Sequence, residues 1–290
     1  MKNDAARILT PGSINYRMFV RTIKTYYRRE GRVLSWRPPA LALHASGEVV
    51  RPYEVLVSEV MLQQTQVGRV KEKYEEFIKR FPDVRALAQA PLSDVLRLWQ
   101  GLGYNRRALF LKRAAEEVVA VHGGILPCSR EVLETLPGIG GATAASIAVF
   151  AWNIPEIFVE TNIRSVFIHF FFPDAEKISD AELLPLIEKT LDRKNPREWY
   201  YALMDYGTML KKQHKNPSRR SAAHIRQKRF KGSLREARGA VIRAVLEHSY
   251  SLAELKKLLR LEPHKIGKAV LGLMKEGFLK KTNGKYGMGE

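Results

Sequence analysis

The chain has 290 residues, of which 45% are hydrophobic and 27% are charged, as in an ordinary globular protein. No stretch approaches the roughly 20 apolar residues of a membrane span, and the N-terminus lacks the features of a secretory signal peptide. Cys128 is the only cysteine, which excludes intramolecular disulfides and clusters held by several cysteines. We therefore expect a cytoplasmic protein without a membrane partner.

The net charge is +19, and it is concentrated in the C-terminal part of the chain. Residues 211–290 contain 21 Lys and Arg against 6 Asp and Glu, whereas residues 1–210 contain 28 against 24. Clustered cations bind phosphates strongly because they release condensed counterions. This pattern favours a nucleic acid as partner over an acidic membrane surface or a role in solubility alone.

The first half of the chain has helical periodicity and no convincing alternating strands. The periodicity predicts helices within INYRMFVRTIKTYYRR (14–29), YEVLVSEVMLQQTQVGRVKEKYEEFIKRF (53–81), DVRALAQAP (83–91), LSDVLRLWQGLGY (92–104) and NRRALFLKRAAEEVVAVHGG (105–124). The second of these is long enough for two helices, and Gly123 and Gly124 mark the end of the last one.

Three glycines precede an apolar run of small residues in LPGIGGATAASIAVF (136–150). We predict a helix that starts after the N-cap Ser129, a tight hairpin from Pro137 to Gly141, and a second helix from about Thr143. Because a helix N-terminus attracts anions and glycines permit a close approach, Gly138, Gly140 and Gly141 favour phosphate binding over a plain helix–helix turn. Further helices are expected in DAELLPLIEKTL (180–191) and PREWYYALMDYGTMLKK (196–212).

The sequence pattern changes at residue 212 and again at residue 234. Residues 212–233 have no apolar period and are interpreted as a basic linker or an extended segment on the surface. A new module starts at Leu234, with helices expected in LREARGAVIRAVLE (234–247), SLAELKKLLRL (251–261) and PHKIGKAVLGLMKEG (263–277). Asn283-Gly284 then predicts a hairpin turn, so residues 234–290 form a winged-helix-like module.

Several motifs resemble those of one enzyme family in the same order along the chain. VSEVMLQQTQV, LWQGLGYNRRA, LETLPGIGGATAASI and ALMDYG are similar to motifs of helix–hairpin–helix DNA glycosylases, and more narrowly to A/G-specific adenine DNA glycosylases. The resemblance covers residues 15–212. It implies an all-α, two-lobed helix–hairpin–helix glycosylase fold. With the changes in composition at residues 212 and 234, the predicted domains are 1–211 (glycosylase), 212–233 (basic segment in place of a cluster loop) and 234–290 (winged-helix-like).

Cleavage of an N-glycosidic bond needs a proton for the leaving base and a negative charge near an oxocarbenium-like sugar. By resemblance, Glu59 is the acid that protonates the purine, and Glu160 takes the position of the superfamily's catalytic aspartate. Asn162 matches an asparagine that assists there. The residues alone leave an alternative for each position. Glu59 is then a glutamate on a helix face in water, and Glu160 is a carboxylate that stabilises a helix N-terminus. Glu160 departs from the family because it is one methylene longer than aspartate.

The resemblance also implies which residues contact DNA and the base. Base recognition falls to Arg37 and to Tyr201, which stands where the family commonly has a glutamine. Tyr104 is expected to wedge between bases, although it is also a candidate core aromatic. The full set expected to bind DNA comprises Gln63, Gln64, Tyr104, Gly138, Gly140, Gly141, Thr143, Arg219, Arg220, Arg226 and Arg229.

Two family features are missing from the sequence. The family usually holds an iron–sulfur cluster with cysteines spaced C-x6-C-x2-C-x5-C after the MDYG helix, and residues 209–233 contain no cysteine. We therefore expect no cluster, no other metal and no cofactor, with the basic segment contacting phosphates instead. Ala142 replaces the lysine by which related enzymes open the DNA backbone, so no AP-lyase activity is expected.

These observations predict a monomeric, nucleoid-associated DNA glycosylase of base excision repair. Its substrate would be double-stranded DNA with a mispaired base, with adenine opposite G or oxidised G as the first candidate. Two alternatives stay open from the sequence. One is a glycosylase for uracil, thymine or hypoxanthine, and the other is a non-catalytic protein that binds damaged DNA.

Overall fold

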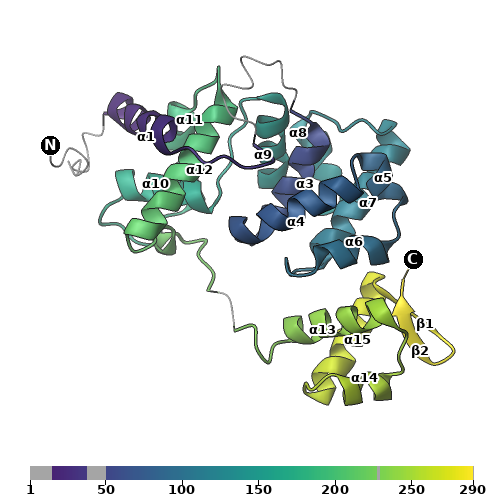
Figure 1. Ribbon diagram of the computed structural model, residues 1–290. Coiled ribbons are helices and arrows are strands. Elements are labelled where there is room, and N and C mark those ends of the chain that lie inside the picture. Colours follow the sequence, from purple (N-terminus) through teal and green to yellow (C-terminus); the bar gives the residue numbers. More distant parts are fainter. Residues whose placement is uncertain (1–14, 38–49, 227–228, 290) are drawn as a thin grey trace. The chain divides into compact units, whose positions relative to one another are not determined.

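The computed structural model describes residues 15–37, 50–226 and 229–289 (Figure 1). The chain forms two compact units built from interleaved segments. Unit 1 combines Met1–Val55, Cys128–Glu134 and Gly140–Arg226, and unit 2 combines Leu56–Pro127, Thr135–Ile139 and Gln227–Glu290. Because the segments interleave in this way, the expected domain boundaries at residues 211 and 233 stay a prediction.

Unit 1 is a helical bundle around α12 (Pro196–Gln213), which contacts α1 (Tyr16–Glu30), α9 (Gly141–Trp152) and α10 (Thr161–Phe171). The helix α11 (Asp180–Thr190) and the 3-10 helix η1 (Pro217–Arg220) pack on α10. Aromatic side chains fill the core between these helices, and Phe19 lies with its ring centroid 6.0 Å from that of Trp199. Both of these side chains are fully buried.

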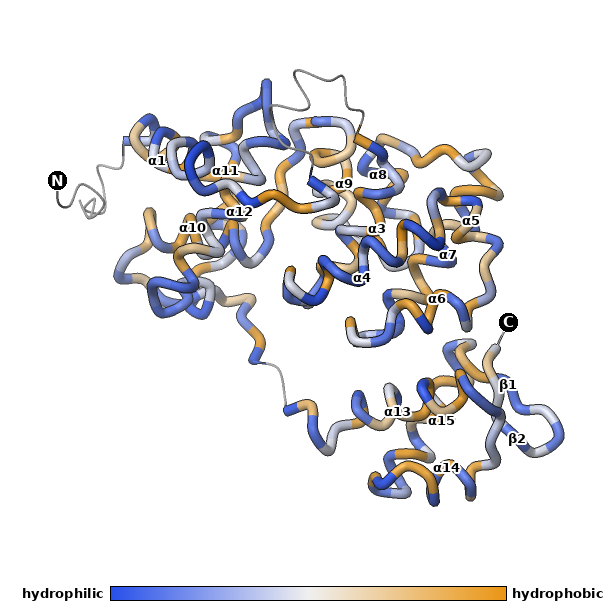
Figure 2. The backbone as a smooth tube through the Cα atoms, in the orientation of Figure 1, coloured by the Kyte–Doolittle hydropathy of each residue, from blue (hydrophilic) through white to orange (hydrophobic). Residues whose placement is uncertain are grey.

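Local signals explain why these helices begin where they do. The Asn15 side chain accepts hydrogen bonds from the backbone amides of Arg17 and Met18, which fixes the start of α1. Hydrophilic and hydrophobic residues are interspersed along α1 (Figure 2). The buried ones are Phe19 and Ile23. The helix α9 is instead apolar on all sides, and its small residues let it be buried from Ala144 to Ala151.

Unit 2 contains the end of α3 (Pro52–Leu62), α4 (Val67–Arg80), α5 (Val84–Gln89), α6 (Leu92–Trp99) and α7 (Arg106–His122). Here α7 contacts α5 and α6, and α4 contacts α6. The fully buried Trp99, Phe77 and Phe81 form an aromatic cluster between α4 and α6. Gly123 ends α7 in the left-handed conformation, as the glycine pair predicts. The helix α8 (Arg130–Thr135) spans the change from unit 1 to unit 2.

The C-terminal segment of unit 2 consists of α13 (Leu234–Glu247), α14 (Leu252–Leu258), α15 (Pro263–Glu276) and a hairpin of β1 (Leu279–Thr282) and β2 (Lys285–Met288). The strands are antiparallel, with Leu279 opposite Met288. Asn283 and Gly284 both have positive φ, as the predicted turn requires. The elements follow the expected order, and the description of this module as winged-helix-like stays a prediction.

The structure confirms a mostly helical fold and corrects two details of the sequence analysis. The helix after the hairpin begins at Gly141, not near Thr143. The stretch after residue 211 is not a bare linker: α12 continues to Gln213, and Pro217 and Ser218 are buried in η1. Within the described ranges, no helix is both long and apolar enough to span a bilayer.

Candidate active site and DNA interface

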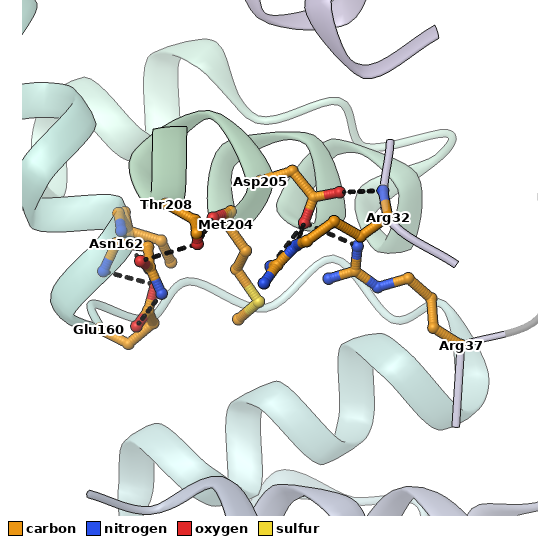
Figure 3. Close-up of polar contacts among 8 residues, drawn as sticks. Arg32, Arg37, Glu160, Asn162, Met204, Asp205 and Thr208 are labelled. Atoms are coloured by element: carbon orange, nitrogen blue, oxygen red, sulfur yellow. Dashed lines mark hydrogen bonds and ion pairs between the residues drawn. The ribbon is translucent and has the colours of Figure 1, made fainter. Parts of the chain in front are cut away.

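Glu160 is held rigidly at the N-terminus of α10 (Figure 3). Its Oε1 accepts hydrogen bonds from the backbone amides of Asn162, at 2.7 Å, and Ile163, at 3.0 Å. Its Oε2 accepts from the Asn162 side-chain amide at 3.1 Å. The longer arm of glutamate therefore folds back as a helix cap, and both oxygens have fixed directions. The positive end of the α10 dipole and three hydrogen-bond donors therefore face this carboxylate.

Asn162 connects this carboxylate to α12. Its Oδ1 lies 3.4 Å from the hydroxyl of Thr208, which donates a shorter bond of 2.8 Å to the carbonyl of Met204. Gly207 makes this close approach possible, because a Cβ at that position would lie 2.5 Å from the Asn162 carbonyl oxygen. Gly207 and Thr208 thus set the distance between α10 and α12 at the carboxylate.

Lys211, one turn further along α12, adds a cation to the surroundings of Glu160. Burial lowers the pKa of the Lys211 ammonium group, and the negative charge of Glu160 acts in the opposite direction. Unit 1 therefore carries both the fixed carboxylate of Glu160 and the half-buried ammonium group of Lys211, which interacts with it.

Asp205 forms a second polar cluster on α12 with two arginines from the N-terminal segment (Figure 3). This carboxylate is buried, and its Oδ1 accepts from Arg37 at 2.8 Å and from Arg32 Nε at 2.7 Å. The backbone amide of Arg32 also donates to its Oδ2 at 2.7 Å. A buried charge needs such partners, and here they anchor the segment after α1 to α12. Sequence reasoning missed Asp205 and Arg32, which lie 173 positions apart.

Arg37 and Tyr201, the residues expected to recognise the base, are in contact with each other. The Arg37 guanidinium lies 3.9 Å from the centroid of the Tyr201 ring. That ring also stacks on Phe150 at 4.7 Å and an interplanar angle of 4°. Arg37 is 4% exposed and Tyr201 is 6% exposed. The structure therefore explains both residues by their packing, and base recognition by them stays a prediction.

Glu59 lies on α3 in the part of the helix that belongs to unit 2. It is half-buried, and its neighbours Ser58 and Val60 are buried. It is therefore neither a fully solvated glutamate nor a core residue. Its helix ends at Leu62, and the loop that follows carries Gln63 and Gln64.

Different structural reasons account for glycine at each position of the hairpin. Gly138 has φ +78°, and a Cβ there would lie 2.7 Å from the Cβ of Phe110. Gly140 is the N-cap of α9, and an added Cβ would meet open space. Thr143 lies in the first turn of that helix, and its carbonyl accepts a bond from Ser146. The first amides of any helix lack intrahelical acceptors, and the open space at Gly140 leaves the backbone there accessible to an anion. At Gly141 an added Cβ would lie 3.0 Å from Glu134 Oε1, and phosphate binding by these glycines stays a prediction.

The four arginines expected to bind DNA near residue 220 are not equivalent. Arg219, Arg226 and Arg229 are exposed. Arg220 is instead taken up by carbonyl oxygens at the end of α10, with bonds to Phe172 at 2.5 Å, Pro173 at 2.7 Å and Ala175 at 3.0 Å. These contacts fix η1 on α10, and phosphate binding by Arg220 stays a prediction.

Comparison with known proteins agrees with this fold and these motifs. A family model described as "HhH-GPD superfamily base excision DNA repair protein" matches residues 57–189. The chain is 30% identical over 205 residues to the thymine/uracil-DNA glycosylase of Pyrobaculum aerophilum, covering 68% of this chain and 85% of that protein. This chain therefore belongs to the HhH-GPD superfamily of base excision DNA repair proteins.

Adenine-type relatives are matched over a smaller share of their own length. The chain is 34% identical over 198 residues to the adenine DNA glycosylase of Buchnera aphidicola subsp. Baizongia pistaciae, covering 67% of this chain and 53% of that protein. It thus spans about half the length of this relative. Among solved structures, a thermostable thymine-DNA glycosylase superposes with a TM-score of 0.57 at 25% identity, covering 67% of this chain and 86% of that one.

Proposed function

We propose that this protein is a monofunctional DNA glycosylase that removes adenine mispaired with G or oxidised G. The observation that carries the proposal is the fixed carboxylate of Glu160 at the start of α10. The similarity to adenine DNA glycosylases supports adenine as the leaving base.

The proposed mechanism divides the work between two glutamates. Glu59 donates a proton to the purine, which makes the base a better leaving group. The carboxylate of Glu160 stabilises the positive charge that develops on the deoxyribose. Asn162 keeps the Glu160 carboxylate in one orientation, so that little reorganisation is needed during the reaction. Water then adds to the sugar carbon, and the proton that it releases restores the acid form of Glu59.

A second substrate class has its own support. The relative from Pyrobaculum aerophilum carries the name thymine/uracil-DNA glycosylase and is matched over most of its length. Tyr201 also stands where adenine-type enzymes commonly have a glutamine. Removal of thymine or uracil from a mispair with G is therefore the alternative that the experiment must separate from adenine removal.

The test uses duplexes with one labelled strand and four central pairs: A opposite G, A opposite oxidised G, T opposite G and U opposite G. Alkali treatment after incubation cleaves the strand wherever a base has been removed. We expect cleavage at adenine. Cleavage at thymine or uracil alone would support the second class, and tight binding without cleavage of any duplex would identify a non-catalytic damage-binding protein.

The role of Glu59 is tested with a matched pair of variants on α3. Glu59→Gln should slow excision about 10²- to 10⁴-fold, because glutamine cannot donate the proton, with duplex affinity kept within a few-fold. Glu54→Gln on the same helix removes a carboxylate that pairs with Arg51 and should leave excision unchanged. Normal turnover of Glu59→Gln would remove Glu59 from the mechanism.

A further inference from the structure

Two loops of unit 2 hold non-glycine residues in a backbone conformation that L-residues avoid. Gln64, in the loop between α3 and α4, has φ +54°, and Tyr104, in the loop between α6 and α7, has φ +49°. The left-handed region is unfavourable for such residues and persists only when the surroundings enforce it. Both residues belong to the set expected to open the DNA strand, which raises the question of what enforces their shape.

A single side chain ties both loops together. Arg107, in the first turn of α7, is 9% exposed. Its Nη1 donates to the carbonyl oxygens of Val60 and Met61, each at 2.8 Å, at the end of α3. Its Nη2 donates to the Thr65 hydroxyl at 2.8 Å, directly after Gln64. The first loop is therefore fixed at both ends by one guanidinium.

The same nitrogen reaches the second loop. Arg107 Nη2 lies 3.2 Å from the Leu102 carbonyl oxygen and 3.1 Å from that of Gly103, directly before Tyr104. The indole of Trp99 donates a further bond to Gly103 at 3.1 Å. The Thr65 hydroxyl also lies 3.4 Å from the Leu102 carbonyl, so the two loops are bridged directly.

The charge of Arg107 has no carboxylate among these partners. Burial lowers the pKa of its guanidinium to about 10, and the group stays protonated at neutral pH. Its Nε has no hydrogen-bond partner within the described residues. Burying a cation against carbonyl oxygens is costly in free energy, and hydrophobic packing of α7 would not require it. Hydrophobic packing of α7 alone therefore does not account for a buried arginine at this position.

We propose that Arg107 is a positioning residue for strand opening, which clamps the loops of Gln64 and Tyr104 in one fixed relation so that both side chains enter the duplex together. The inference rests on the proposed function, since strand opening matters to an enzyme that acts on an extrahelical base. Arg107 itself acts through the two loops. Lysine at this position has a single ammonium group and cannot replace both ends of the fork.

The chain offers a matched control on the same helix. Lys112 is also 9% exposed, and its ammonium group donates to the carbonyl of Ala88 at 3.0 Å and to Glu116 at 2.6 Å. It is a buried cation of α7 that ties this helix to α5 and touches neither loop. Lys112→Met therefore reports what the removal of a buried cation does to folding alone.

The experiment compares Arg107→Met, Arg107→Lys and Lys112→Met in the full chain. 2-Aminopurine beside the mispair reports base unstacking by its fluorescence, and single-turnover excision and melting temperature are measured in parallel. We expect Arg107→Met to abolish the fluorescence rise and to slow excision about 100-fold, the scale of a small misplacement of reacting groups. Arg107→Lys should fall between it and the wild type, and Lys112→Met should change melting temperature alone.

A double-mutant cycle with Tyr104→Ala separates positioning from general stability. If Arg107 acts through the loop of Tyr104, Arg107→Met should cost much less in the Tyr104→Ala background, so that the two effects are not additive. Additive effects, or equal fluorescence for Arg107→Met and Lys112→Met, would overturn the proposal. If Arg107→Met does not fold, Arg107→Lys carries the same comparison. Fluorescence without excision in the wild type would reject the proposed function and leave this inference testable.

Discussion

Arg235, at the start of α13, donates a hydrogen bond of 2.7 Å from Nη1 to the hydroxyl of Tyr104, 131 positions earlier in the chain. Its guanidinium carbon lies 5.6 Å from the centroid of the same ring. The residue expected to wedge between bases is thus in contact with the C-terminal part of unit 2. Tyr104 is 36% exposed, so it is not a core aromatic.

A first prediction distinguishes the role of the Tyr104 ring from the role of its hydroxyl. Tyr104→Ala should weaken binding to a mispaired duplex by about 1–3 kcal/mol, because a base loses its stacking partner. Tyr104→Phe keeps the ring and should retain most of this affinity, as should Arg235→Ala. Equilibrium titrations with matched and mispaired duplexes measure the difference. A lower melting temperature with unchanged relative affinity would assign the ring a structural role.

The capping geometry of Glu160 leads to a second prediction. Glu160→Gln retains an oxygen that accepts from the amides of α10 but removes the charge. Excision should fall about 10²- to 10³-fold, as when an electrostatic stabiliser of the transition state is removed, with little change in melting temperature. Glu160→Asp keeps the charge and should stay far more active than Glu160→Gln. Single-turnover kinetics on the preferred duplex tests this, and equal rates for the two variants would rule out a charge-dependent role.

A third prediction concerns the exposed cations within and after η1. Replacing Arg219, Arg226 and Arg229 together by Gln should lower the salt slope of duplex binding by about 0.9 for each phosphate that is no longer neutralised. Affinity for matched and mispaired duplexes should fall about equally. Arg220 is left in place because it holds η1 on α10.

The matched control replaces three exposed cations of unit 1 outside this segment, namely Lys177, Lys189 and Lys194. It has the same change in net charge as the triple arginine variant and should leave the salt slope nearly unchanged. Equal slopes for the two triple variants would show that net charge, and not this segment, sets the affinity. Iron analysis of the purified protein completes the test, and a visible absorption band from iron would overturn the expectation of a cluster-free enzyme.

A fourth prediction concerns backbone cleavage. Ala142 has no amine, and the proposed mechanism uses water instead of a covalent imine. We expect the protein to leave abasic DNA uncut, and borohydride to trap no protein–DNA adduct. A high yield of trapped adduct would show that another amine, such as Lys211, takes that part.

A fifth prediction follows from the pKa of Glu276. Burial would raise it, but bidentate contacts with Arg106 and Arg238 lower it below the ordinary value of a glutamate. Because the pKa is lower in the folded state, this stabilisation is present above the unfolded pKa and disappears as the pH falls through the folded one. Glu276→Gln should therefore lower the melting temperature at neutral pH, and the difference should shrink as the pH falls below about 4.3, the ordinary pKa of a glutamate. A constant difference across this range would contradict the assignment.

The sequence was most informative where structure is determined locally. Ser129 and the pair Gly123-Gly124 marked helix ends that the structure has at the same places, because caps and stop signals act within a few residues. The hairpin at Asn283-Gly284 was predictable for the same reason. Helical periodicity supplied most of the elements in between.

Long-range contacts could not be predicted in this way. Nothing near Arg220 indicates that carbonyls almost fifty positions earlier will accept its hydrogen bonds. The pairing of Asp205 with Arg32 and Arg37 likewise depends on how α12 meets the N-terminal segment. For the candidate site, residue types and a family resemblance suggested Glu160 and Asn162, and the helix N-terminus was already one interpretation of Glu160. Only the folded structure reveals the contacts of Asn162 with the Glu160 carboxylate and with Thr208 on α12.

Gly207 limits how this protein can change by mutation. Any side chain there would collide with the backbone of Asn162, so a complete substitution library should retain glycine alone at this position. Gly267, within α15, faces open space and imposes no such limit. Alanine there should stabilise the chain by about 0.4–1 kcal/mol, since it restricts the unfolded state without a clash. The two glycines therefore mark opposite extremes of mutational tolerance, one closed to variation and one available for engineering a more heat-resistant form.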